Sequence, residues 1–142
     1  MPHNAIISIR PLFVDAILSG AKTVELRRRI PSIDIGTKLW IYATLPVGAV
    51  VGAAIAQDFH YASPAELWVR YARHAAIPRD DFDAYFLGTD RGVGIELSSV
   101  QKIEPISIEY LRVMRDGFHP PQVLTKITND EANYLSGFAL AA

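Results

Sequence analysis

The spacing of hydrophobic and polar residues changes several times along the chain, and each change marks a new element. A period of two predicts a strand, because alternate side chains point to opposite faces, and a period near 3.6 predicts a helix. Short β-branched or aromatic runs predict strands at 5–9, 38–44, 49–59 and 92–100. A charged segment that alternates in the same way predicts a further strand at 23–29.

Helices are expected where apolar residues recur at helical spacing after a start signal. Pro11 can occupy the first turn of a helix that Gly20 ends, and Ser63-Pro64-Ala65-Glu66 has the form of a capping box. The expected helices cover 11–20, 64–75, 80–86 and 107–115, and a last one begins near Thr128.

The resulting order, β-α-β-β-β-α-α-β-α-α, contains more consecutive strands than an alternating βαβ fold would have. It predicts an α+β fold in which a mixed, largely antiparallel sheet curls into a small barrel surrounded by helices. Gly52, inside a strand, indicates a bulge or a close approach of two backbones. We find no repeat, low-complexity tract or linker, so residues 1–142 are expected to form one domain.

Composition limits the possible functions. The 14 basic and 15 acidic side chains give a net charge of −1, so any binding of nucleic acid requires a local basic patch. The absence of cysteine excludes disulfides, thiolate metal sites and a cysteine nucleophile. The N-terminus lacks the basic region of a signal peptide, and the most apolar stretch, 47–56, is too short to span a bilayer. We therefore expect a cytoplasmic protein without a membrane partner.

A basic patch can form from the segment LSGAKTVELRRRIP, residues 18–31. Strand alternation points Val24 and Leu26 one way, and it points Thr23, Glu25, Arg27 and Arg29 the other way. One interpretation is a solvated sheet face whose ion pairs contribute little. The other is a cleft, because Lys22 is fixed by the turn at Gly20 and because Tyr42 on the next strand offers an aromatic wall.

A positive groove with an aromatic wall suits a ligand that carries both phosphate and a base. In this interpretation the cations contact phosphate, Glu25 orients them or accepts a bond from a base amine, and Tyr42 stacks on a base. No metal or cofactor is expected. The candidate ligand-binding residues are Lys22, Glu25, Arg27, Arg28, Arg29 and Tyr42.

Other polar residues fit structural roles better. The four histidines, His3, His60, His74 and His119, are too widely separated in sequence to indicate a metal site. Glu66, Arg70 and Arg73 have a spacing typical of helix-stabilising pairs, and Trp68 and Tyr71 are expected in the core. The rigid FHPPQ segment leaves two interpretations open. It closes one side of the cleft with Phe118, His119 and Gln122, or it is a connector that docks the C-terminal helix.

The segments AILSGAKTVELRRRIP and GTKLWIYATLPVGAVVGAAIA resemble the ASCH domain, a branch of the PUA-like superfamily. The hallmark of that family, G-x-K-x-x-E-x-R, is matched by Gly20, Lys22, Glu25 and Arg27. The resemblance covers residues 5 to about 103. The later PISIEYLRVMRDGFHPPQ is similar to the C-terminal part of bacterial members described as predicted transcriptional regulators.

The resemblance implies a PUA-like barrel of five or six strands with a cleft lined by the motif residues, and RNA or another nucleic-acid-derived ligand as the partner. Some small members are similar to amidohydrolases that act on an acetylated cytidine, and others have been linked to RNA cleavage. The amidohydrolase pattern K-T-x-T-x-R places its catalytic lysine at Lys22, but Glu25 stands where the second threonine would be. The acid of those enzymes is not evident in 70–81, where His74 is the nearest ionisable group.

The sequence therefore favours a module that binds RNA or a modified nucleoside. The alternative is a hydrolase that uses the same cleft, either an N4-acetylcytidine-type amidohydrolase or a ribonuclease, with Lys22 as the activated group. A protein-interaction domain in transcriptional control is a further alternative. An enzyme needs a group with a shifted pKa near the reacting atom, whereas a binding module needs only complementarity.

Overall fold

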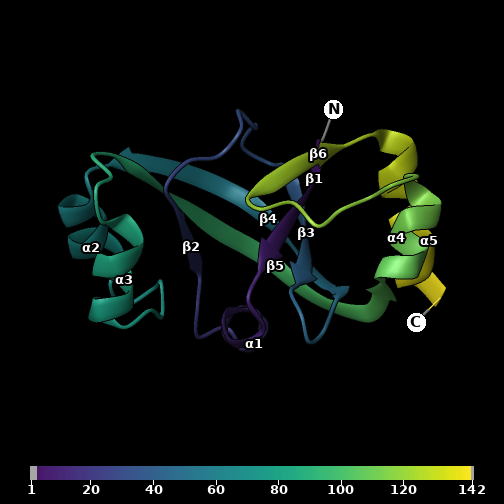
Figure 1. Cartoon of the computed structure of the whole chain (residues 1–142), viewed down its shortest axis with the longest axis horizontal. Coiled ribbons are helices and arrows are strands. Elements are labelled where there is room, and N and C mark those ends of the chain that lie inside the picture. The colour runs from purple at the N-terminus through teal and green to yellow at the C-terminus, as the bar shows by residue number, and fades with distance from the viewer. Residues whose placement is uncertain (1–2, 142) are drawn as a thin grey trace.

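The computed structural model describes residues 3–141, whose six strands and five helices are labelled in Figure 1. The strands are β1 (Asn4–Ile9), β2 (Val24–Arg27), β3 (Lys38–Ala43), β4 (Ala49–Ala62), β5 (Gly92–Ser107) and β6 (Leu124–Ile127). The helices are α1 (Pro11–Ser19), α2 (Pro64–Tyr71), α3 (Arg79–Phe86), α4 (Ile108–Met114) and α5 (Asn129–Ala141).

All six strands belong to one sheet, in the order β2-β5-β4-β3-β1-β6. The β1–β3 pair is parallel and the other four pairs are antiparallel. The predicted α+β fold with a mixed, largely antiparallel sheet is thus confirmed. The barrel is not closed by hydrogen bonds, since β2 and β6 form the two edges of the sheet.

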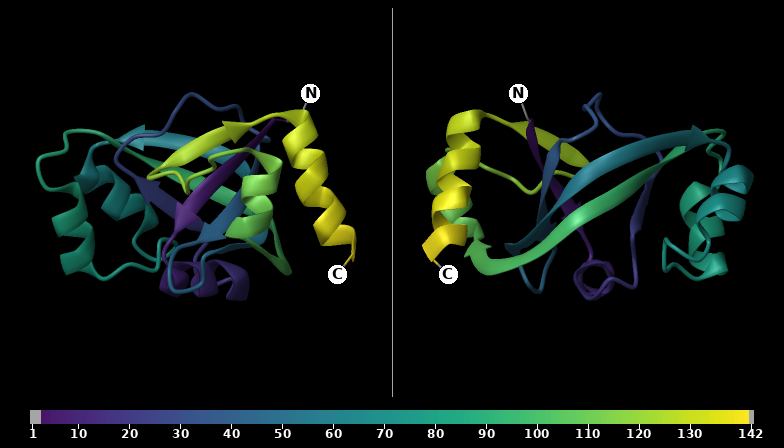
Figure 2. Two further views of the ribbon diagram at one scale, coloured as in Figure 1. Left: turned by 45° about the vertical axis from the view of Figure 1, so that its right-hand side comes forward. Right: turned by 180° about the vertical axis from the view of Figure 1, so that it is seen from behind.

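Strand β5 has 16 residues and is much longer than the sequence predicted, while β4 has 14 and extends only slightly beyond its predicted range. They run together from α2 and α3 at one end of the molecule to α4 and α5 at the other (Figure 2). Their pairing shifts register at three places, one of them between Val50 and Gly52, as the predicted irregularity at Gly52 requires. The bulges explain why simple alternation does not reveal the full length of these strands.

The helix signals in the sequence correspond to real caps. Gly20 ends α1 with a φ of 87°, a conformation that glycine adopts without steric penalty. Ser63 accepts a hydrogen bond from the Glu66 amide at 3.3 Å at the start of α2. Thr128 and Glu131 cap α5 reciprocally, at 3.1 and 2.9 Å. Within residues 3–141, no helix is both long enough and apolar enough to cross a lipid bilayer.

The sequence did not predict β6. This four-residue strand pairs antiparallel with β1, from Leu124 opposite Ile7 to Ile127 opposite Asn4. It lies between the proline pair of 120–121 and the cap of α5, so its signal is too short to be separated from those of its neighbours. Its position brings the segment before it, 119–123, to the edge of the sheet opposite β2.

Buried side chains form three clusters. The first lies between α1 and the sheet, and the second lies between the other face of the sheet and the C-terminal helices, around Trp40, Leu111 and Leu135. The third packs Val24 and Leu26 of β2 against α2 and α3. Tyr71 is buried in this third cluster and Trp68 packs against it, so their predicted core role is confirmed.

Gly52→Ala is expected to lower the free energy of unfolding by about 1–3 kcal/mol, as overpacking of a core does. An added Cβ would lie 2.8 Å from the Gln101 carbonyl oxygen and 2.9 Å from Leu18 Cδ2. The matched control is Gly137→Ala in α5, where, apart from the adjoining residues and the local backbone of the helix, nothing in the described part of the chain lies within 4 Å of the new Cβ. Alanine there should raise stability by about 0.5–1 kcal/mol. Urea unfolding of both variants tests the pair, and equal effects would contradict the close approach at Gly52.

Candidate functional site

A hollow of about 350 Å³ opens beside β2, between the two edges of the sheet. Its walls come from β2, the end of β1, the start of α1 and the segment that precedes β6. The edge strands β2 and β6 do not pair with each other, so the hollow lies in the gap between the two edges of the curled sheet. Its lining residues are Ser8, Ile9, Arg10, Phe13, Lys22, Glu25, Leu26, Arg27, Thr44, Ile77, Tyr85, Pro121 and Gln122.

Lys22 lies at the floor of the hollow and is only 3% exposed. The left-handed turn at Gly20 lets the Lys22 amide bond the Ala16 carbonyl at 3.0 Å, which fixes the direction of the side chain. Lys22 Nζ donates to the Ala75 carbonyl, lies 3.3 Å from Glu25 Oε1 and lies 4.9 Å from the centre of the Phe13 ring. Burial lowers the pKa of Lys22; Glu25 opposes this shift and Arg27 adds to it.

Glu25 is held between two cations. Arg27 Nε and Nη2 lie 2.9 and 2.7 Å from Glu25 Oε2, while Lys22 contacts the other carboxylate oxygen. Arg27 Nη2 also donates to the Ser8 carbonyl at 2.6 Å, which ties β2 to the end of β1. The three side chains thus carry a net charge of +1 in a nearly buried position.

This arrangement excludes the interpretation of β2 as a solvated face. Strand alternation directs Glu25 and Arg27 into the hollow, and it directs Val24 and Leu26 to the third cluster, although Leu26 also borders the hollow. All four residues of β2 are buried. Thr23 departs from the prediction, because it is exposed and lines a different hollow on the other side of β2.

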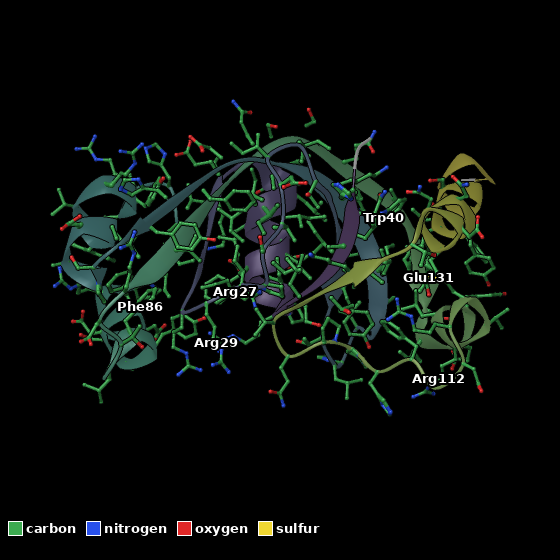
Figure 3. The ribbon with its side chains drawn as sticks, turned by 90° about the horizontal axis from the view of Figure 1, so that it is seen from above. Arg27, Arg29, Trp40, Phe86, Arg112 and Glu131 are labelled. Carbon is green, nitrogen blue, oxygen red and sulfur yellow. The ribbon has the colours of Figure 1, made fainter. Side chains whose placement is uncertain are left out.

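Arg28 and Arg29 lie beyond the strand, which ends at Arg27 instead of Arg29. Both are exposed, and both line a second hollow of about 580 Å³ that adjoins the first. The two hollows share Arg27, Tyr85 and Gln122 as their common wall. Figure 3 shows Arg27 in the interior of the curled sheet and Arg29 near its rim.

The predicted position of Tyr42 is wrong. Tyr42 is 4% exposed and belongs to the second cluster, together with Trp40, which lies toward the C-terminal helices in Figure 3. Along β3, Leu39, Ile41 and Ala43 face the first cluster, so alternation turns Trp40 and Tyr42 to the opposite face. Burial raises the pKa of Tyr42, and Arg112 opposes this shift.

Two other aromatic residues, Phe13 and Tyr85, take the place that was predicted for Tyr42. The Phe13 ring lies under Lys22 and 5.0 Å from the Arg10 guanidinium. The Tyr85 hydroxyl accepts a hydrogen bond from the Arg28 amide at 3.1 Å, and its ring lies 5.0 Å from the Arg28 guanidinium. Arg28 and Tyr85 are 57 positions apart in the sequence, which explains why no local pattern connects them.

The FHPPQ segment combines features of both of its interpretations. Phe118 is buried in the second cluster, as expected of a connector that docks the C-terminal helices. Gln122 lines both hollows, and Pro121 lines the first, as expected of a wall of the cleft. His119 is exposed and lines neither hollow.

The remaining histidines lie apart from the site. His60 is half-buried with its ring against the edge of Tyr71, at 6.1 Å between centroids. The His74 carbonyl accepts bonds from the Thr23 and Val24 amides and so anchors the start of β2. No group of three or more His, Asp or Glu side chains able to hold a metal ion occurs in the described part of the chain.

Behind β2, a separate network surrounds Glu96. Tyr71 donates to Glu96 Oε2 at 2.6 Å, and Arg70 Nη2 lies 3.7 Å from the same oxygen. Burial, together with this hydrogen bond, raises the pKa of Tyr71 to about 12. Arg70 therefore pairs across to β5, in place of the predicted pairing with Glu66 along its own helix.

No family model matches the chain. Similar proteins and solved structures nevertheless identify its family. An ASCH domain-containing ribonuclease of Zymomonas mobilis is 40% identical over 132 residues, which make up 93% of this chain and 89% of that protein. The crystal structure of ASCH from Z. mobilis matches with a TM-score of 0.91 at 40% identity, over 94% of both chains.

A crystal structure of a single-residue variant of that protein matches with a TM-score of 0.92 at 39% identity, over 94% of this chain and 96% of the other. The N-terminal domain of Staphylothermus marinus McrB shares the fold alone, with a TM-score of 0.60 and 14% identity over 94% and 93% of the two chains. The identity and coverage of the Z. mobilis relative confirm the resemblance seen in the G-x-K-x-x-E-x-R motif. The chain belongs to the ASCH domain family.

Proposed function

We propose that the protein binds RNA in the hollow beside β2. The observation that carries this proposal is the pair of cations, Lys22 and Arg27, held around the single carboxylate of Glu25 in a concave and mostly desolvated site. Arg10 adds a third cation at the mouth of the hollow. An excess of positive charge in such a site attracts phosphate strongly, because little solvent screens it. The name of the Z. mobilis relative, a ribonuclease, supports RNA as the ligand.

The size of the hollow fits one nucleotide. Its volume of about 350 Å³ lies at the lower end of the range in which proteins hold small molecules. A base entering it meets Tyr85, which lines both hollows, and an aromatic ring can stack on a base without regard to base identity. A free nucleotide or a nucleoside derivative is the alternative occupant, and it would use the same contacts.

Binding of a labelled single-stranded RNA, followed by fluorescence anisotropy over a salt series, tests the proposal. We expect weak binding through two or three phosphate contacts, and log affinity should fall with log salt by about 0.7 per contact. Arg10→Gln should weaken binding about three- to tenfold. Arg73→Gln removes the same charge from an exposed site that lines neither hollow, so it should leave binding unchanged. Equal affinities of the two variants would place RNA elsewhere.

Cleavage of the bound RNA is the second candidate function. Two observations favour it: the relative is named a ribonuclease, and Lys22 has a lowered pKa inside the hollow. A lysine with a lowered pKa gives up its proton more readily, as a group that transfers protons must. Gel analysis of labelled RNA incubated with the protein tests this function directly.

A further inference from the structure

The second hollow has the chemistry of a phosphate site. Its lining residues are Arg27, Arg28, Arg29, Tyr85, Gly88, Thr89, Gln122 and Val123, which include three arginines and no carboxylate. In the first hollow, by contrast, Glu25 partly neutralises the cations. Arg27 is paired with Glu25 in both hollows, so the second hollow adds two cations, Arg28 and Arg29, with no carboxylate among its lining residues.

The arginines of the second hollow differ in how they are held. Arg27 is committed to Glu25 and Ser8 through Nε and Nη2. The Arg28 guanidinium rests against the Tyr85 ring at 5.0 Å, which orders it without using its hydrogen-bond donors. Arg29 is exposed, and its side chain makes no hydrogen bond or ion pair to any of residues 3–141. Arg28 and Arg29 thus present unsatisfied donors to a ligand.

The opposite side of this hollow leaves room for a polar group. Gly88 follows the C-cap of α3 with a φ of 77°, and, apart from its chain neighbours, no described residue lies within 4 Å of the position of a Cβ there. Thr89 follows with its hydroxyl, which can donate to a phosphate oxygen. Only a layer of side chains separates this space from the first hollow, and it consists of Arg27, Tyr85 and Gln122.

We infer that the second hollow binds the phosphate of the nucleotide that follows or precedes the one in the first hollow. The ligand is then an RNA segment of at least two nucleotides, and not a free nucleoside. This inference rests on the proposed binding of RNA in the first hollow.

The test compares two probes on the full chain: a labelled pentaribonucleotide of randomised sequence and the four free ribonucleosides. The variants are Arg29→Gln and the double variant Arg28→Gln/Arg29→Gln. Arg73→Gln is the control, and its charge change equals that of Arg29→Gln. We expect the pentanucleotide to bind at least tenfold more tightly than any nucleoside. The double variant should weaken pentanucleotide binding about tenfold and reduce its salt slope by about 1.4, as the loss of two contacts requires. Nucleoside binding should stay within twofold of that of Arg73→Gln.

The outcomes separate this inference from the function on which it rests. If the double variant binds the pentanucleotide as Arg73→Gln does, the second subsite is refuted and RNA binding in the first hollow stands. If wild type binds the nucleosides as tightly as the pentanucleotide, phosphate contributes nothing to binding, and the proposed function fails together with the second subsite. If wild type binds neither probe, the proposed function fails and the inference fails with it. Arg29→Lys keeps the charge at an exposed position. It should therefore retain most of the affinity that Arg29→Gln loses, and failure to do so would contradict a phosphate contact.

Discussion

Glu25→Gln is expected to lower the free energy of unfolding by about 3–5 kcal/mol, as removal of one partner from a buried ion pair does. The carboxylate is buried and contacts Lys22 at 3.3 Å and Arg27 at 2.7 Å, so glutamine leaves two cations without a counter-charge. Lys22 can shed its proton to escape this penalty, but Arg27 cannot. Urea unfolding at neutral pH measures the loss.

The matched control is Glu96→Gln on β5. Glu96 also contacts an arginine and a hydroxyl, but its side chain is 34% exposed and its distance from Arg70 is 3.7 Å. Solvent screens such a pair, so its loss should lower stability by about 1 kcal/mol or less. A Glu25→Gln variant as stable as Glu96→Gln would show that water reaches the Lys22–Glu25–Arg27 cluster, and the site could not then be described as desolvated.

The charged motif was the part of the site that the sequence could reveal. Lys22, Glu25 and Arg27 lie within six consecutive residues, so a helix stop followed by strand alternation is enough to bring them to one face. Their partners come from distant parts of the chain. The Ser8 and Ala75 carbonyls and the Tyr85 ring reach the motif only through tertiary folding, and backbone carbonyls leave no mark in a sequence.

Two features of the site, the position of Tyr42 and the presence of strand β6, were not predicted correctly, because their sequence signals are local. Tyr42 was assigned to the site because it lies on the strand that follows β2 along the chain, but in the sheet β2 pairs with β5, and β3 lies between β4 and β1. Sequence neighbours are thus not neighbours in this sheet. Strand β6 was missed because four residues give too short a pattern, yet pairing with β1 brings Gln122 into both hollows. Strand order, which the sequence does not state, thus keeps Tyr42 away from the site and brings Gln122 into it.

Lys22→Met is expected to change how stability depends on pH. Burial lowers the folded-state pKa of Lys22 below the ordinary value of 10.5. In the pH range between the lowered pKa and 10.5, the unfolded chain therefore binds more protons than the folded one. Stability contributed by this group therefore rises as pH increases through that window, and it is constant below it. Wild type should gain stability relative to Lys22→Met as pH approaches 10.5, in urea unfolding at a series of pH values.

Subtracting the stability of Lys22→Met from that of wild type at each pH removes the contribution of the other titrating groups. Tyr71, whose pKa is raised to about 12, has the opposite sign, because the unfolded tyrosine loses its proton first and stability falls between pH 10 and 12. That loss is common to wild type and Lys22→Met and cancels in the comparison. A wild-type advantage that stays flat or shrinks toward pH 10.5 would show that Glu25 outweighs burial and keeps the lysine in its usual protonation range.

The same residue separates RNA binding from RNA cleavage. If Lys22 holds a phosphate as a cation, Lys22→Met should weaken RNA binding about ten- to hundredfold, because a hydrogen bond to a charged group contributes roughly 1.5–3 kcal/mol. Lys22→Arg keeps the charge and should retain much of the affinity. If Lys22 transfers a proton, Lys22→Arg should still bind RNA but lose cleavage, because arginine does not give up its proton. Wild-type cleavage that Lys22→Arg abolishes, with binding intact, would establish the second candidate function. Cleavage that persists in Lys22→Arg would assign the chemistry to another group.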